Sequence, residues 1–215
     1  MSMTTAAVLG TGAWGTTFAQ VLADAGVDVT MWGRNADTIS FINGHENPTY
    51  LPGITLSERI CATTDIASAV SGEQLVVVAV PVKAVRATLE AARDAFVPDV
   101  ALLSLAKGLE LGSLKRVDEV IADASGVPEE RIAVLSGPNL SREIAEQQPT
   151  ATVVASTDVE PATTPISAPT SPPTSWAPRW RARPRTSSRS PSAPPRAWAW
   201  ALTPARPSSH AAWPR

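Results

Sequence analysis

The sequence of 215 residues predicts an α/β fold over residues 1–160, with an open, doubly wound and mostly parallel sheet. Three observations lead to this prediction. Segments of strand character alternate with segments of helical periodicity, which is typical of parallel strands joined by crossover helices. The run "LVVVAVP", residues 75–81, is apolar and β-branched without alternation, as in a central strand covered on both faces. A glycine-rich turn separates the first expected strand from the first expected helix.

The first elements form a βαβ unit. An apolar strand, Ala6–Leu9, leads into the turn "GTGAWG", and "TTFAQVLADAG" continues with apolar residues at helical spacing until a glycine ends it. "VDVTMWG", Val27–Gly33, is expected to be the second strand. Strand, turn, helix and strand within about 30 residues make a βαβ unit, whose strands are parallel and whose crossover is right-handed.

The following elements extend the same sheet. A turn-rich excursion, Asn43–Leu56, precedes the central strand, and Pro81 ends that strand before the amphipathic helix "VKAVRATLEAARDAF". "VALLSLAKGLE", Val100–Glu110, is expected to be a strand followed by a loop. "RIAVLSGPNLSREIAEQQPTATVVAS", Arg131–Ser156, is expected to hold a strand, a Gly-Pro turn, a short helix and a further strand.

Charge and composition divide the chain near residue 160. Residues 1–160 hold all 20 acidic residues and 10 of the 18 lysines and arginines, whereas residues 161–215 carry eight arginines, no acidic residue and 13 of the 20 prolines. The first part is long enough to bury a core. The second shows no helical or strand period and is expected to be disordered or irregular. The predicted domains are therefore an α/β domain, 1–160, and a tail, 161–215.

Several classes of protein are excluded by simple counts. Cys61 is the sole cysteine, so a disulfide framework is excluded and a reducing compartment is favoured. No run of about 18 apolar residues indicates a membrane span, and the N-terminal sequence does not resemble a signal peptide. The cytoplasm is the expected location. His45 and His210 are too isolated to form a metal site, so no bound metal is expected.

The glycine-rich turn has the dinucleotide-binding pattern G-x-G-x-x-G at Gly10, Gly12 and Gly15. The first glycine allows the tight turn, the second lets a pyrophosphate approach the backbone, and the third lets helix and strand pack closely. The helix that follows offers free N–H groups and its positive dipole end to phosphate. Three glycines near a turn also occur for structural reasons alone, but a strand before them and a helix after them favour dinucleotide binding.

Arg34 bears on the choice of cofactor. It follows the second strand in "TMWGRN", where an NAD-selective site usually offers a carboxylate to the ribose 2′-hydroxyl. An arginine there can face the 2′-phosphate of NADP, which favours NADP slightly and leaves the use of both cofactors open. A solvated surface arginine is the alternative.

Five motifs, taken together, resemble bacterial NAD(P)-dependent glycerol-3-phosphate dehydrogenase over residues 4–156. They are "GTGAWGTTFA", "NPTYLPG", "VVVAVP", "SLAKGLE" and "SGPNLSREIA", in this order and at similar spacing. The resemblance implies a Rossmann-like domain that binds NAD or NADP. It also implies hydride transfer between that cofactor and dihydroxyacetone phosphate or sn-glycerol 3-phosphate, a reaction that supplies phospholipid synthesis. A different phosphate-substrate dehydrogenase of similar fold is an alternative.

The resemblance assigns site residues motif by motif. Those implied at the cofactor are Gly10, Gly12, Ala13, Trp14, Gly15, Arg34, Asn35, Pro81, Lys107 and Ser141. Those implied at the substrate are Lys107, Gly137 and Asn139. The ammonium of Lys107 suits a phosphate or a developing alkoxide, and a solvated lysine is the alternative. For Ser136 or Asn139 the alternative is a helix N-cap before "LSREIA", although both roles can coexist.

A catalytic group implied by the family is missing. The resemblance implies a proton-transfer lysine in a helical second domain, within a segment resembling "DVVGxExGGAxKNVIA" that is followed by "GLGxNxxxxLITRGLAE". Neither segment occurs in this chain, and residues 161–215 contain no lysine. No catalytic residue is therefore assigned, since the general acid/base of hydride transfer is absent. Little or no turnover is expected, and the homodimer that the resemblance suggests is in question without the second domain.

The tail has three interpretations. Its arginines and tryptophans suit a basic arm that attracts phosphates and stacks on bases, and its prolines suit a linker. The third comes from the genetic code, when codons are regrouped by one base. Residues 174–179 then permit D-V-V-G-A-E, 185–188 permit K-N-V-I, 198–201 permit M-G-L-G and 208–215 permit L-I-T-R-G-L-A-E. We interpret the tail as the family's second domain translated out of frame, with no nucleic-acid partner.

The nucleotide sequence tests this interpretation. Adding or deleting one base in the codons for residues 155–165 should restore an uninterrupted second domain, with a lysine codon where Arg185 stands in this chain. Resequencing that region is the measurement. If no one-base change there extends the family-like frame, the interpretation is wrong.

Overall fold

One sheet organises the part of the chain that the computed structural model describes, which is residues 3–148, 150–156 and 197–202. Its strands lie in the order β3-β2-β1-β4-β5-β6-β7-β8. Their bounds are β1 (Thr5–Leu9), β2 (Asp28–Trp32), β3 (Ile60–Thr63), β4 (Leu75–Val78), β5 (Ala101–Ser104), β6 (Ile132–Ser136), β7 (Thr150–Ser156) and β8 (Ala197–Leu202). Neighbours from β3 to β6 are parallel, whereas β7 pairs antiparallel with both β6 and β8.

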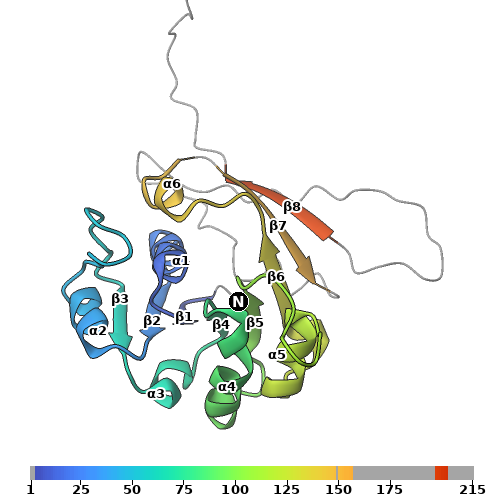
Figure 1. Cartoon of the computed structure of the whole chain (residues 1–215). Helices are drawn as coiled ribbons and strands as arrows, with labels where there is room; N and C mark the ends of the chain where they lie inside the picture. Colours follow the sequence, from blue (N-terminus) through green and yellow to red (C-terminus); the bar gives the residue numbers. More distant parts are fainter. Residues whose placement is uncertain (1–2, 149, 157–196, 203–215) are drawn as a thin grey trace, which may run out of the picture.

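Helices cover both faces of this sheet (Figure 1). They are α1 (Ala13–Asp24), α2 (Ala36–Asn43), α3 (Ile66–Val70), α4 (Val82–Ala92), α5 (Val117–Ser125) and α6 (Ser141–Ala145), with the 3-10 turns η1 (Arg93–Ala95) and η2 (Glu129–Arg131). In Figure 1, α1 and α6 lie on one side of the strands, and α3, α4 and α5 lie on the other. The prediction of a Rossmann-like, doubly wound sheet is confirmed. None of the helices in the described part of the chain has the length and hydropathy needed to cross a membrane.

The central strand β4 explains why its sequence is apolar without alternation. Leu75 and Val77 belong to the core on the α1 side, whereas Val76 and Val78 belong to the core beneath α4 and α5. All four side chains are almost completely buried. Because successive side chains of a strand point to opposite faces, a strand between two helical layers needs apolar residues at every position.

Some boundaries differ from those expected. The ladder of β4 ends at Val78 and not at Pro81, because Ala79 and Val80 leave it and line a pocket instead. Pro81 then precedes α4, as a residue without a free N–H is tolerated at a helix start. Sequence reasoning did not identify α2, β3, α3 or α5.

The tail is described only in part. Its residues 161–196 and 203–215, with His210 and the segments that permit the K-N-V-I and L-I-T-R-G-L-A-E strings, lie outside the described residues. The six residues Ala197–Leu202 are described as the strand β8, which pairs antiparallel with β7. The edge of β7 offers backbone N–H and C=O groups for this pairing.

The close approach of α1 to β1 generates a prediction for Gly15→Ala. A Cβ at residue 15 would lie 2.2 Å from the carbonyl oxygen of Gly10. Since backbone must then move, we expect the free energy of unfolding in urea to fall by about 2 kcal/mol or more. Gly12→Ala is the matched control, because no atom lies within 4 Å of its Cβ position. The loss there should be about 0.5–1 kcal/mol, since alanine is a poorer N-cap residue than glycine. Equal losses in the two variants would contradict this account.

Candidate cofactor site

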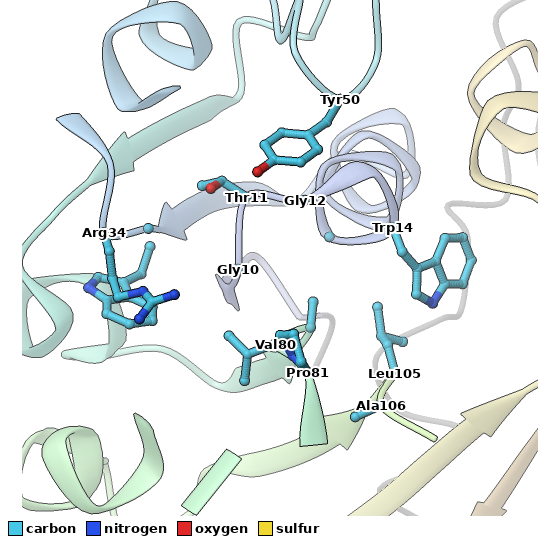
Figure 2. Close-up of a pocket in the computed structure, with 14 residues that line it drawn as sticks. Gly10, Thr11, Gly12, Trp14, Arg34, Tyr50, Val80, Pro81, Leu105 and Ala106 are labelled. Carbon is cyan, nitrogen blue, oxygen red and sulfur yellow. The ribbon is translucent and has the colours of Figure 1, made fainter. Parts of the chain in front are cut away.

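A pocket of about 480 Å³ opens at the carboxyl ends of β1, β2 and β4 (Figure 2). The chain leaves β1 toward β2 on one side, and β4 lies on the other side of β1. This is the topological switch point of the sheet, where open α/β folds bind ligands. Figure 2 shows Arg34 at one end of the pocket and Trp14 at the other.

Six of the ten residues that the sequence suggested for the cofactor line this pocket: Gly10, Gly12, Trp14, Gly15, Arg34 and Pro81. The other four lie outside its lining. Asn35 caps α2 by accepting a hydrogen bond from the backbone N–H of Thr38 (3.0 Å). Ala13 is the first residue of α1, and the Ser141 carbonyl accepts a hydrogen bond from Thr17 Oγ1 of α1 (3.1 Å). Lys107 contacts Gly137 instead.

The three glycines of the turn meet different steric demands. Gly10 has a φ of +128°, and a Cβ there would lie 2.7 Å from the carbonyl oxygen of Ala79. Gly15 packs against the Gly10 carbonyl, whereas a Cβ at Gly12 would meet nothing within 4 Å. The turn therefore leaves open space at the one glycine that the pattern reserves for a pyrophosphate.

The start of α1 is suited to an anion. No side chain caps the helix at Gly12, and no acidic residue lies in its first turn. Free N–H groups at a helix start carry partial positive charge. Without a carboxylate to compete for them, these N–H groups are available to a phosphate.

The Arg34 end of the pocket presents a cation beside an aromatic side chain. Arg34 is exposed, and no carboxylate of the described residues forms an ion pair with it. Trp32, which also lines the pocket, donates a hydrogen bond from its indole to the carbonyl of Thr64 (3.0 Å). The indole is thus held in place, while the guanidinium remains available to a ligand.

The three residues suggested for the substrate lie beyond the Trp14 end. Lys107 directly follows Ala106, which lines the pocket, and its Nζ donates to the carbonyl of Gly137 (2.9 Å). The structure thus brings together the loops that follow β5 and β6. An ammonium has three N–H donors, so this bond leaves two available to a ligand.

Asn139 is fixed by the neighbouring strand β7. Its Nδ2 donates to Thr152 Oγ1, and its Oδ1 accepts from Thr150 Oγ1, each at 3.2 Å. The alternative of a helix N-cap at Ser136 or Asn139 is wrong, because Leu140 precedes α6 and no side chain caps it. The Asn139 amide is hydrogen-bonded to the two threonines and not to the start of α6.

The loop that carries Lys107 is tied down by an ion pair. Arg86 on α4 donates Nε and a terminal nitrogen to the two carboxylate oxygens of Glu110, both at 2.9 Å. Ser113 Oγ donates to the same carboxylate at 2.6 Å. The hydrogen bonds from Arg86, which have the largest effect, and from Ser113 lower the pKa of Glu110 to about 2. The charged carboxylate therefore anchors the loop three residues after Lys107.

Sequence reasoning missed Tyr50, Thr11 and Asn47. Tyr50 and Thr11 line the pocket, and Figure 2 shows the Tyr50 ring beside Thr11 and Gly12. Asn47 is buried next to them and bonds the turn. A polar asparagine and a tyrosine within the "NPTYLPG" excursion were the available indication.

Comparison with known proteins decides the family. Residues 5–162 match the family model described as the N-terminus of NAD-dependent glycerol-3-phosphate dehydrogenase. The chain belongs to this family. The prediction made from its five motifs is therefore confirmed.

Relatives in the glycerol-3-phosphate dehydrogenase family match the same part of the chain. Glycerol-3-phosphate dehydrogenase [NAD(P)+] of Thermobifida fusca is 52% identical over 162 residues, which is 74% of this chain and 48% of that protein. The protein of the same description from Streptomyces griseus is 53% identical over 154 residues, 71% of this chain and 46% of that one. This chain thus spans about half the length of the curated relatives it matches.

Solved structures of the same family have the same fold. The crystal structure of glycerol-3-phosphate dehydrogenase from Coxiella burnetii superposes with a TM-score of 0.65 at 30% identity, covering 70% of this chain and 46% of that one. The enzyme from Saccharomyces cerevisiae gives a TM-score of 0.61 at 26% identity, over 68% and 45% of the two chains. In both, the likeness covers less than half of the solved chain.

The Glu110 ion pair of this family member generates a prediction for acid. The pKa of Glu110 in the folded state, about 2, lies below the ordinary value of about 4.3. The contribution of Glu110 to the free energy of unfolding is therefore fully present above the ordinary pKa and is lost as the pH falls toward 2. Glu110→Gln should therefore lower the urea midpoint by a constant amount from pH 7 to pH 5, and by progressively less toward pH 3. Glu90→Gln on α4 removes an exposed carboxylate that forms no ion pair among the described residues, and should change the midpoint little. A pH-independent difference for Glu110→Gln would contradict the assignment.

Proposed function

We propose that this chain is the dinucleotide-binding half of a glycerol-3-phosphate dehydrogenase and that its pocket binds NAD or NADP. The geometry of the glycine turn carries the proposal. Gly10 and Gly15 are held by close backbone contacts, while the open space at Gly12 faces an uncapped helix start. This combination fits a pyrophosphate, which needs N–H donors and room to approach the backbone.

The rest of the cofactor would extend along the pocket from the turn. We assign the adenosine side to Arg34 and Asn35, with Trp32 beside them, and the opposite side to Trp14 and Pro81. Ala13, Lys107 and Ser141 complete the proposed contacts. When bound, the nicotinamide supplies or accepts a hydride. An arginine free to meet a 2′-phosphate favours NADPH over NADH.

The proposed substrate is dihydroxyacetone phosphate, or sn-glycerol 3-phosphate in the reverse direction. Lys107, Gly137 and Asn139 would bind it, because they adjoin the Trp14 end of the pocket and two loops are already tied there by the Lys107–Gly137 bond. The Lys107 ammonium suits either the phosphate or a developing alkoxide. The Glu110 ion pair keeps its loop in register with that position.

No side chain that lines the pocket in the described part of the chain is assigned as the acid/base that the reaction needs, and Lys107, outside this lining, is assigned to binding. Arg34 and Tyr50 are the only ionisable side chains among those lining the pocket, and both stand on the turn and adenosine sides. Hydride transfer to a carbonyl requires a proton donor at the oxygen. We therefore propose that this chain binds cofactor with little or no turnover, and that residues 161–215 are the second domain read out of frame.

The remaining partners follow from the same proposal. We expect no nucleic-acid partner, because residues 1–160 carry 20 acidic against 10 basic residues and a tail read out of frame has not been selected to bind. A homodimer like that of the family would need the second domain. The exposed free thiol of Cys61 fits a reducing compartment, the cytoplasm.

Cofactor titration and turnover assays test the function together. This chain should bind NADPH and, more weakly, NADH by calorimetry, and Gly12→Ala should weaken both about tenfold or more, since a methyl group would occupy the space proposed for the pyrophosphate. Dihydroxyacetone phosphate should not oxidise bound NADPH. The frame-restored protein should oxidise NADPH with that substrate.

Three results would contradict the proposal. Absence of dinucleotide binding by this chain would refute the cofactor site. Robust turnover by this chain would refute the missing acid/base. Tight oligonucleotide binding that weakens stepwise with salt would instead favour a basic nucleic-acid arm.

A further inference from the structure

Asn47 connects the excursion between α2 and β3 to the glycine turn. It is 1% exposed, and its Nδ2 donates to the carbonyl oxygen of Thr11 (3.0 Å) and to Thr16 Oγ1 (2.8 Å). Thr16 Oγ1 in turn donates to the same Thr11 carbonyl (3.3 Å). We propose that Asn47 is a positioning residue for the dinucleotide: it fixes the Thr11–Gly12 peptide of the turn and the loop that carries Tyr50. This proposal rests on the proposed function of the pocket.

The peptide between Thr11 and Gly12 is held in one orientation. The described residues contain no cis peptide bond, so the Thr11 carbonyl and the Gly12 N–H point in opposite directions. With its carbonyl bound to Asn47 and Thr16, this peptide directs the Gly12 N–H away from the Asn47 side. Gly12 lines the pocket and has open space around it. A turn held in this orientation need not be reorganised when a phosphate binds.

The loop that carries Tyr50 is held by the backbone of Asn47. The Asn47 carbonyl accepts hydrogen bonds from the N–H of Leu51 (2.7 Å) and of Tyr50 (3.2 Å). Leu51 is 2% exposed and anchors the loop, whereas Tyr50 is half-exposed and lines the pocket. Figure 2 shows the Tyr50 ring beside Thr11 and Gly12. The same asparagine thus bonds the turn through its side chain and the Tyr50 loop through its backbone.

The side-chain oxygen of Asn47 lacks a hydrogen-bond donor among the described residues. Asn47 Oδ1 is buried and accepts no hydrogen bond within the described residues. Leaving a buried carbonyl oxygen without a donor is unfavourable for folding. The asparagine is therefore not an optimal residue for stability at this position. Its amide donors, aimed at Thr11 and Thr16, account for its presence better than packing does.

Asn43 on α2 offers a matched control. Its Oδ1 accepts from the N–H of Ala62 (2.8 Å), and its Nδ2 donates to the carbonyl of Ala62 (3.1 Å). Both polar atoms are thus paired, and the contact is made with β3 and not with the turn. Asn43→Ala should lower stability with little effect on the cofactor, whereas Asn47→Ala should weaken cofactor binding with a smaller effect on stability.

Calorimetric titration of the full chain with NADPH and with ADP-ribose tests the proposal. Both ligands contain the pyrophosphate. We expect Asn47→Ala to raise the Kd for each about fivefold to tenfold, the equivalent of one neutral hydrogen bond. Asn47→Asp has the same shape but no amide donor, and it places a negative charge near the phosphates, so its Kd should rise at least as much. Asn43→Ala should change Kd by less than about twofold.

Thr16→Val provides a second route that keeps the shape of the helix residue. It removes one partner of the Asn47 amide, so its Kd should rise, and the increase in the Thr16→Val/Asn47→Ala double variant should be less than the product of the two single increases. This variant carries the test if Asn47→Asp does not fold.

Three results would overturn the proposal, two of them without affecting the proposed function. If Asn47→Asp or, failing that, Thr16→Val binds both ligands as the unaltered chain does, Asn47 does not position the turn, and the proposed function stands. The same holds if the loss of binding in Asn47→Ala only matches that in Asn43→Ala. If the unaltered chain binds neither ligand, the proposed function fails and this inference fails with it.

Discussion

The contact between the backbone of Gly10 and the start of α1 is the constraint on which the cofactor site depends. A Cβ at Gly15 would lie 2.2 Å from the Gly10 carbonyl, so helix and strand approach each other as closely as backbones can. At this separation the N–H groups of the first turn lie at the end of the central strands. A phosphate could not reach both the helix start and the turn if a side chain separated them.

The surroundings of the turn reinforce this geometry from two sides. Ala79 follows β4 and lies against Gly10, while Asn47 bonds the Thr11 carbonyl from the excursion. Neither contact involves a charged side chain, so the turn keeps its partial positive charge for a ligand. The charges are placed farther out, with Arg34 free at one end and the Arg86–Glu110 pair holding the loop of Lys107 near the other.

Residues 5–162 and the tail differ in the chemistry that we propose for them. The family model matches residues 5–162, and every residue that we propose for the cofactor and the substrate lies in that range. Proton transfer requires a further group, and we assign none among the described residues that line the pocket. The proposed out-of-frame tail would account for this with one event, since regrouped codons permit a lysine at residue 185 in family order.

Local sequence was sufficient for β1, β2 and β4, for the three glycines of the turn and for Arg34, because periodicity and the spacing of glycines act over a few residues. Trp14 and Pro81, which also line the pocket, were suggested by the family resemblance. Short elements such as β3 and α3 lacked a clear period and were missed, and β4 is shorter than expected because the chain leaves the ladder where it lines the pocket.

The hydrogen-bond partners of Asn47 and Asn139 were decided only by tertiary structure. Asn47 reaches a residue 36 positions away, and Asn139 bonds β7 where an N-cap was the alternative. Sequence by itself determined the fold class, the family and the glycine-rich turn, whereas the hydrogen-bond partners that hold that turn exist only once distant segments have packed together.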